Sequence, residues 1–239
     1  MEGALSNLSR TVVLTYMDYY RERALSIASV LRKEVMTAVG PDRARTSRKV
    51  SEPADDEALR VVALNAADRL FYARGVQAVG MDELRAASGI SLKRLYRLFP
   101  SKDAIVEQVL LARHRVWTEG VAAAVAREEE PRRRLLAIYD FLADWFSEDG
   151  FRGCAFINSF GELGGFSPRV AEIVRNHKKD FQGYVANLAS EAGAPPTLAP
   201  QLSILAEGAQ TTAAISGSAE PALQARAAAE VLINAALKP

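Results

Sequence analysis

The sequence predicts an all-α protein with nine helices after residue 50 and one further helix before it. In nearly every segment, apolar residues recur every three or four positions, which is the period of an amphipathic helix. Runs that alternate apolar and polar residues are missing from the sequence, and so are Asn-Gly hairpin turns. Prolines, glycines and capping residues separate the segments at helix-length intervals, so the boundaries are predicted as clearly as the helices.

The first 50 residues are expected to form a separate extension. Residues 12–39 read as one amphipathic helix that ends at Gly40-Pro41, and a basic linker follows it. Three interpretations stay open. The helix packs on the rest of the protein or on a second subunit, which we favour; it lies on a membrane surface; or translation starts later, at Met17 or Met36.

Residues 51–101 are predicted to form a domain of three helices. The first follows the helix-start signals around Pro53 and ends at Gly75. The second covers Met81 to Ser88, and Gly89 ends it. The third covers Leu92 to Phe99, between a capping serine and Pro100. Two short helices joined by a four-residue turn are typical of a helix-turn-helix.

Residues 102–239 are predicted to form a second domain of six helices. Their starts are marked by a capping serine or by a proline in the first turn. The expected helices cover residues 102–126, 131–146, 153–163, 168–192, 200–217 and 221–237.

The charge pattern of residues 81–102 favours a nucleic-acid contact. The spacing of five apolar residues predicts the buried side of the helix-turn-helix: Leu84, Ala87, Ile90, Leu95 and Phe99. The outer side of the third helix carries basic residues, and no acidic residue lies between Ser91 and Lys102 to offset them. A helix of this size fits the major groove of B-DNA, where side chains near its N-terminus reach base edges.

The composition excludes several protein classes. The net charge is only +1, but residues 41–102 carry four excess positive charges and residues 103–239 four excess negative charges, which points mildly to a polyanionic partner. The longest uncharged run, residues 192–206, is too short to span a membrane, and no secretory pattern is visible at the N-terminus. A single cysteine excludes an internal disulfide, so we expect a cytoplasmic protein.

The region from Phe71 to Ile105 resembles the DNA-binding region of the TetR (tetracycline repressor) family of bacterial transcription regulators. The run LYRLFPSK after GIS carries most of the resemblance. The resemblance implies that residues 51–101 bind DNA and that residues 102–239 bind a small ligand and form the dimer. Residues 153–158 with Glu162 resemble, more loosely, the ligand domain of one subgroup.

The resemblance also implies which side chains contact DNA. Tyr96 and Lys102 match positions that contact phosphate, and Arg94 and Arg97 match positions that contact base edges or phosphate. Two further positions, Leu92 and Lys93, depart from the family pattern, and Leu92 could instead contact a thymine methyl group. Gly80 replaces the usual serine or threonine cap, which leaves one phosphate contact in doubt. The predicted DNA-binding residues are Leu92, Lys93, Arg94, Tyr96, Arg97 and Lys102.

We therefore expect a homodimeric regulator, most simply a repressor, that binds a palindromic double-stranded DNA operator and is released by a small effector. Aromatic residues are frequent in the middle helices; core packing explains some of them, and a cavity for an apolar or aromatic effector would explain others. Residues 200–217 and 221–237 are rich in alanine and carry more apolar surface than a one-sided helix needs. They are expected to form the dimer interface, although burial within one chain is the alternative.

No catalytic, metal or cofactor site is predicted. The only histidines, His114 and His177, have no metal-ligand partner at helical spacing except Asp180, three residues after the second. Cys154 reads as a small buried group rather than a redox sensor. An enzyme would need a convergent set of catalytic groups, and a DNA-free scaffold would not need a basic helix-turn-helix. Both classes are therefore less favoured.

Overall fold

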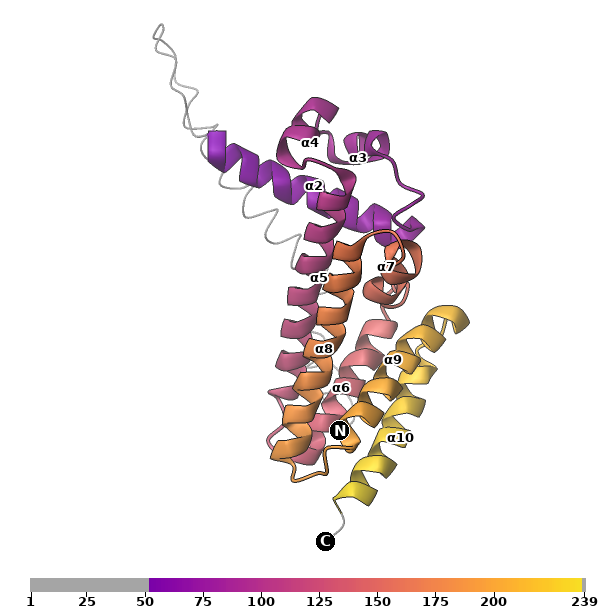
Figure 1. The fold of residues 1–239 in the computed structure, drawn as a ribbon. Helices are drawn as coiled ribbons and strands as arrows, with labels where there is room; N and C mark the ends of the chain where they lie inside the picture. The colour runs from indigo at the N-terminus through magenta and orange to yellow at the C-terminus, as the bar shows by residue number, and fades with distance from the viewer. Residues whose placement is uncertain (1–51, 238–239) are drawn as a thin grey trace, which may run out of the picture. The chain divides into compact units, whose positions relative to one another are not determined.

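A computed structural model describes residues 52–237, and within this range the chain is all-helical with no strand (Figure 1). The nine helices expected after residue 50 are confirmed. The helix expected at 12–39 and the basic linker lie outside the described residues. The helices are α2 (Glu52–Arg74), α3 (Met81–Ser88), α4 (Leu92–Leu98), α5 (Lys102–Val125), α6 (Pro131–Phe146), α7 (Ala155–Leu163), α8 (Pro168–Glu191), α9 (Leu198–Ser216) and α10 (Glu220–Ala236).

Local capping explains most helix ends. The Ser167 hydroxyl accepts a hydrogen bond from the Val170 N–H at 3.3 Å at the start of α8, and the Glu130 carboxylate does the same for two N–H groups of α6. Helices α7, α9 and α10 begin without a side-chain cap, and α9 begins two residues before Pro200, the start that the sequence predicts. A proline is tolerated there, since the first four N–H groups of a helix have no partner within the helix.

The described chain divides into two compact units. The first comprises residues 52–69 and 80–105, and the second comprises residues 70–79 and 106–237. The division passes through α2 and α5, whereas the sequence analysis placed a single boundary between residues 101 and 102. Each unit has a buried core of its own.

The core of the first unit holds α4 against its neighbours with a small set of apolar side chains. The buried residues are Ala63, Ala66, Ala67, Leu84, Ile90, Leu95, Leu98, Phe99 and Ile105. One expectation was wrong here: Ala87 is exposed, and Leu98 is buried instead. Helix α3 has only eight residues, and Leu84 in its first half is the one that is buried, whereas Ala87 in its last turn stays open to solvent.

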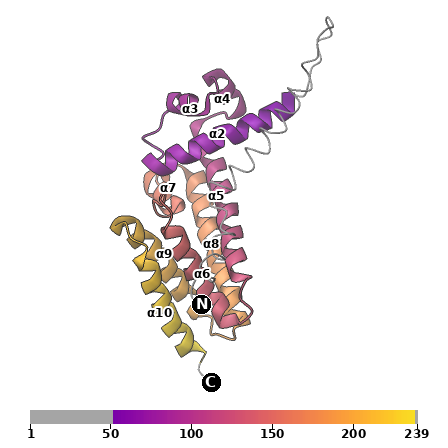
Figure 2. The same cartoon turned by 180° about the vertical axis from the view of Figure 1, so that it is seen from behind.

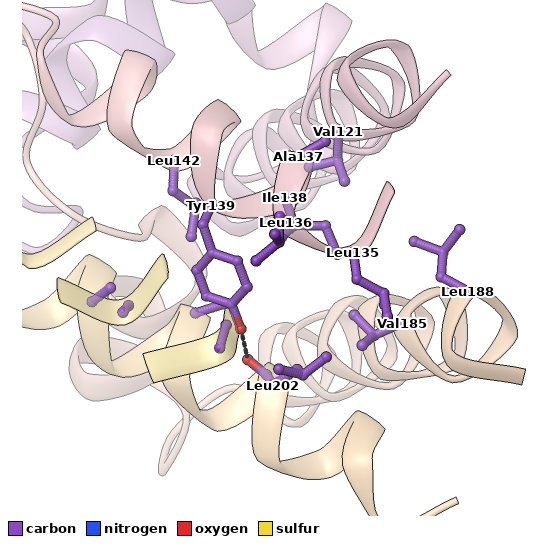
Figure 3. Close-up of a cluster of buried hydrophobic side chains, with 14 of the residues drawn as sticks. Val121, Leu135, Leu136, Ala137, Ile138, Tyr139, Leu142, Val185, Leu188 and Leu202 are labelled. Atoms are coloured by element: carbon purple, nitrogen blue, oxygen red, sulfur yellow. Dashed lines mark hydrogen bonds between the residues drawn. The ribbon is translucent and has the colours of Figure 1, made fainter. Parts of the chain in front are cut away.

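The core of the second unit is centred on α6, whose middle turns are buried on all sides. Tyr139 is 1% exposed, and its hydroxyl donates a hydrogen bond of 2.7 Å to the Leu202 carbonyl of α9 (Figure 3). Leu135 of α6 and Val185 and Leu188 of α8 belong to the same buried cluster (Figure 3). Burial raises the pKa of the Tyr139 hydroxyl, so this group stays a hydrogen-bond donor at neutral pH.

Helices α9 and α10 pack side by side, and α10 also packs on α6 (Figures 1 and 2). Helix α10 buries three alanines and one isoleucine at helical spacing: Ala222, Ala225, Ala229 and Ile233. The opposite side of α10 is exposed in the single chain. No helix among residues 52–237 combines the length and apolar character needed to cross a membrane.

The segment 70–79 is tied to α7 and the turn before it, all within the second unit. The Tyr72 hydroxyl donates to the Gly153 carbonyl at 2.8 Å and accepts from the Arg152 N–H at 2.9 Å. The Gln77 N–H donates to the Glu162 carboxylate at 2.9 Å, and the Gln77 side-chain amide donates to the Glu162 carbonyl at 2.6 Å. Two polar anchors therefore fix both ends of this segment.

Candidate nucleic-acid interface

The turn between α3 and α4 has the geometry of a helix-turn-helix. Gly89 has a φ of +69°, in the left-handed region where a side chain is strained, and its N–H donates to the Arg85 carbonyl at 3.0 Å. Ser91 is extended, and its hydroxyl accepts from the Arg94 N–H at 3.4 Å, which caps α4. The glycine stops one helix and the serine starts the next, as the sequence predicts.

The start of α3 shows how the chain compensates for Gly80. A glycine has no side chain to cap the helix, but its own N–H donates to the Glu83 carboxylate at 2.9 Å. This is one half of a capping box, and the hydroxyl half is missing. The helix is therefore closed by an acidic side chain, without the hydroxyl that a serine or threonine would present to a phosphate.

The two sides of α4 differ sharply in character. Leu95 and Leu98 are buried in the core of the first unit. Lys93, Tyr96 and Arg97 are exposed, and the Tyr96 side chain is 51% exposed although it is aromatic. The other two predicted contact residues on this helix, Leu92 and Arg94, are half-buried. The structure thus brings the five α4 residues that the sequence analysis selected onto one short helix and leaves three of them open to solvent.

Lys102 is the first residue of α5 and is half-buried. The Ser101 hydroxyl accepts from the Ala104 N–H at 3.1 Å, so a capped helix start lies beside the lysine. Helix N-termini carry a partial positive charge, which favours an anion such as phosphate. The positive charge of Lys102 and the N-terminus of α5 would therefore both attract a phosphate at this position.

One acidic residue of this surface escaped the sequence analysis. Asp56 on α2 forms an ion pair with Arg94, and its Oδ1 also lies 3.2 Å from the Arg97 guanidinium. The expectation that no acidic residue offsets these arginines holds only along α4 itself. Asp56 is 38 residues from Arg94 in sequence, so no local spacing could reveal the pair.

Comparison with known proteins agrees with this geometry. Residues 63–109, which span the turn and both helices around it, match the family described as bacterial regulatory proteins, tetR family. This stretch is therefore similar to the DNA-binding region of that family. The proteins that the chain resembles are regulatory proteins, which agrees with the expectation that the chain is not an enzyme.

Curated relatives match over about a third of this chain. An HTH-type transcriptional regulator of Mycobacterium tuberculosis is 36% identical over 73 residues, 30% of this chain and 36% of the relative. The HTH-type transcriptional activator FasR of Mycolicibacterium smegmatis is 34% identical over 91 residues, 37% of this chain and 42% of FasR. The chain thus spans about a third of the length of the first of these curated relatives.

Solved TetR-family structures match over a longer range. A TetR-family transcriptional regulator from Streptomyces coelicolor has a TM-score of 0.71 at 26% identity, covering 75% of this chain and 96% of that one. The reduced form of Escherichia coli NemR has a TM-score of 0.61 at 25% identity, covering 72% of this chain and 94% of NemR. The similarity extends through the C-terminal helices and confirms the predicted fold class.

The second unit brings the two histidines of the chain together. His114 on α5 and His177 on α8 place their Nδ1 atoms 3.0 Å apart, and the Phe156 ring stacks on His177 with 3.5 Å between ring centres. Burial, with smaller contributions from Lys178 and His114, lowers the pKa of His177 to about 3, so its ring is neutral at neutral pH. His177 is therefore a buried histidine whose ring nitrogen has a partner in His114.

Cys154 is buried, as expected, but it has a charged neighbour that the sequence analysis missed. The Lys178 ammonium lies 3.7 Å from the Cys154 sulfur and 3.4 Å from the Glu207 carboxylate. These residues come from the start of α7, from α8 and from α9, so only the fold brings them together. No group of three or more potential metal ligands occurs among the residues that the structure describes.

Proposed function

We propose that this protein is a transcriptional regulator that binds double-stranded DNA by placing α4 in the major groove. The observation that carries the proposal is the division of α4 into a buried apolar side and an exposed side with Lys93, Tyr96 and Arg97. The match of residues 63–109 to a family of bacterial regulatory proteins supports it. Binding to chromosomal DNA would place the protein in the bacterial cytoplasm.

The predicted contact residues fall into two roles within this proposal. Leu92, Lys93 and Arg94 lie in the first turn of α4, from which side chains reach base edges. Tyr96, Arg97 and Lys102 lie farther along and at the start of α5, where they would contact the backbone. Phosphate contacts set affinity and orientation, whereas base contacts set sequence preference.

The two roles predict different effects of alanine substitutions. Arg94→Ala should weaken binding to the preferred sequence by about 1–3 kcal/mol and leave random DNA less affected, because a base contact is lost. Lys102→Ala should weaken binding to all sequences and lower the slope of log K against log salt by about one. Fluorescence anisotropy on a duplex selected from a random library, and on random duplex, measures both.

Lys179→Ala is the matched control, because it removes an exposed positive charge from α8 in the other unit. It should change neither affinity nor salt slope. An equal loss on selected and random DNA for Arg94→Ala would show that this arginine contacts phosphate rather than a base. Failure of the unaltered protein to select any duplex would refute the proposed function itself.

Two directions of regulation have support. Repression requires only that the bound protein covers a promoter, so it is our first proposal. Activation is the second candidate, because one relative in the helix-turn-helix region is described as a transcriptional activator. In vitro transcription from a promoter carrying the selected sequence separates them: added protein lowers transcript yield in the first case and raises it in the second.

We infer that α9 and α10 form the interface of a homodimer. Exposed apolar residues occur at every fourth position along α10, and α9 also has exposed apolar residues. The residues of this uncovered stripe are Ile204, Ile215, Leu223, Ala227, Val231 and Ala235. Small residues allow helices to approach closely, and two copies of the same stripe are complementary under a twofold axis. A twofold dimer would read an imperfect palindrome with half-sites about one helical turn apart.

We also propose that a small apolar or aromatic effector acts through the second unit. Aromatic side chains gather there: Trp117 lies edge-on to both His177 and Phe181, with ring centres 5.1 and 4.9 Å apart. Helix α5 belongs to both units, so a shift in its C-terminal part would reach Lys102 through one continuous helix.

An effector that binds the DNA-free state about 10–100-fold more tightly would supply roughly 1.4–2.8 kcal/mol of coupling. Screening an aromatic fragment library by Trp fluorescence, followed by anisotropy on the selected duplex, tests this. Every ligand that quenches Trp117 should weaken DNA binding. A tight ligand at Trp117 that leaves DNA affinity unchanged would contradict the coupling.

A further inference from the structure

Two arginines of the proposed DNA-reading helix share one carboxylate oxygen. The Nη2 atoms of Arg94 and Arg97 both approach Oδ1 of Asp56, which lies in the first part of α2 within the same unit. The Arg94 pair is the closer of the two, and the Arg97 pair measures 3.2 Å. The side chains of Asp56 and Arg94 are 31% and 29% exposed, so a ligand in solvent can reach this pair.

The pairing leaves the arginines incompletely satisfied. A guanidinium offers five N–H donors, and its best partner is a carboxylate or phosphate that accepts two of them side by side. Arg94 instead gives one terminal nitrogen to Asp56, and its Nε is buried without an acceptor among the described residues. One carboxylate between two guanidinium groups also leaves a net positive charge. A phosphate would offer more acceptor oxygens than Asp56 does.

We propose that Asp56 is an internal competitor of the DNA backbone. In the free protein its carboxylate holds Arg94 and Arg97; when duplex DNA binds, a phosphate takes at least one of the two guanidinium groups from it. The inference rests on the proposed DNA binding and adds a residue outside the helix-turn-helix to it. Asp56 thereby lowers affinity for duplex DNA of any sequence, which keeps the basic helix from binding every phosphate it meets.

The expected effect follows from the cost of exchanging one partly exposed ion pair. Such pairs are worth about 0.2–1 kcal/mol, so removing the competitor should raise affinity for random duplex by roughly 1.4- to 5-fold. Each additional phosphate contact steepens the plot of log K against log salt by about 0.9. Asp56→Asn should therefore show both a tighter complex and a slope steeper by about one.

The neighbouring residue supplies a matched control. Asp55 is exposed on the same turn of α2, and Asp55→Asn changes the net charge of the protein by the same amount without touching the arginines. Anisotropy titrations of a 30-base-pair random duplex between 50 and 200 mM NaCl compare the two variants. Asp56→Asn should raise the affinity for this duplex clearly more than Asp55→Asn does. Asp56→Glu, which keeps the carboxylate, should stay within twofold of the unaltered protein.

Two results would overturn the inference. One is an equal gain for Asp55→Asn and Asp56→Asn, which would mean that only general charge matters. The other is a full gain for Asp56→Asn in a background with Arg94→Gln and Arg97→Gln, where no guanidinium is left to release. Asp56→Ala repeats the test if the asparagine variant unfolds, as judged by circular dichroism. If the unaltered protein binds no duplex at 50 mM salt, the proposed function fails, and this inference fails with it.

Discussion

Leu223→Arg together with Val231→Arg in α10 is expected to convert the proposed dimer to monomers and to weaken DNA binding by roughly 100-fold. Leu223 and Val231 are 59% and 67% exposed in the single chain, two turns apart on the uncovered stripe. A charge buried against an identical apolar stripe has no partner, which costs several kcal/mol. The proposed dimer would bind a palindrome through two copies of α4, so a monomer would keep only half of the contacts.

Sedimentation velocity at micromolar concentration measures the subunit equilibrium, and anisotropy on the selected duplex measures binding. Gln182→Arg with Ala186→Arg is the control pair, because these residues are also exposed and one turn apart, on α8. The control should remain dimeric. The altered side chains on α10 are solvent-exposed, so monomer folding should survive. Dimers that persist with both α10 substitutions would place the interface elsewhere.

Phe156→Ala is expected to lower the free energy of unfolding by about 3–5 kcal/mol. The ring is 3% exposed and stacks on His177 nearly in parallel, with 6° between the ring planes. Removing it opens a cavity beside a neutral imidazole and loses the contacts of a whole aromatic ring. Urea denaturation followed by circular dichroism measures the change in the free energy of unfolding. The slope of the transition should change little, so the shift of the midpoint reports this change.

Phe166 provides the comparison within the same chain. It lies between α7 and α8, and it is 86% exposed, so Phe166→Ala should change the free energy of unfolding by less than about 0.5 kcal/mol. Similar losses for both substitutions would mean that Phe166 is covered in solution, for instance by a second subunit. A loss of less than 1 kcal/mol for Phe156→Ala would contradict the stacked, close-packed arrangement.

The helices could be predicted from the sequence because their end signals act within one turn. Gly89 needs a left-handed backbone, Ser91 caps α4, and Pro131 opens α6, and each of these effects involves residues at most four positions apart. The identity of the outward residues of α4 followed from the same local spacing. The buried side of α3, which has only eight residues, was harder to predict from the sequence, and Ala87 was wrongly assigned to it.

The electrostatic partners could not be predicted, because they are distant in the sequence. Asp56 meets Arg94 across 38 positions, and His114 meets His177 across 63. The absence of acidic residues along α4 therefore suggested that its arginines are unpaired, whereas both contact Asp56. Only packing of α2 against α4, and of α5 against α8, brings these groups within hydrogen-bond distance.

The hydrogen bonds that hold residues 70–79 determine which segments of this chain can be exchanged in a chimaeric protein. The segment precedes α3 in sequence, yet Tyr72 and Gln77 have their hydrogen-bond partners at Gly153 and Glu162, about 80 residues later. A chimaera that grafts residues 52–101 onto a foreign effector module would leave the Tyr72 hydroxyl and the Gln77 amides without their acceptors. By sequence order, residues 70–79 belong with the DNA-binding helices. By their hydrogen bonds, they belong with the effector module to which Gly153 and Glu162 contribute. Exchange of DNA specificity between such proteins would succeed more readily with residues 80–101, which leave both anchors in place.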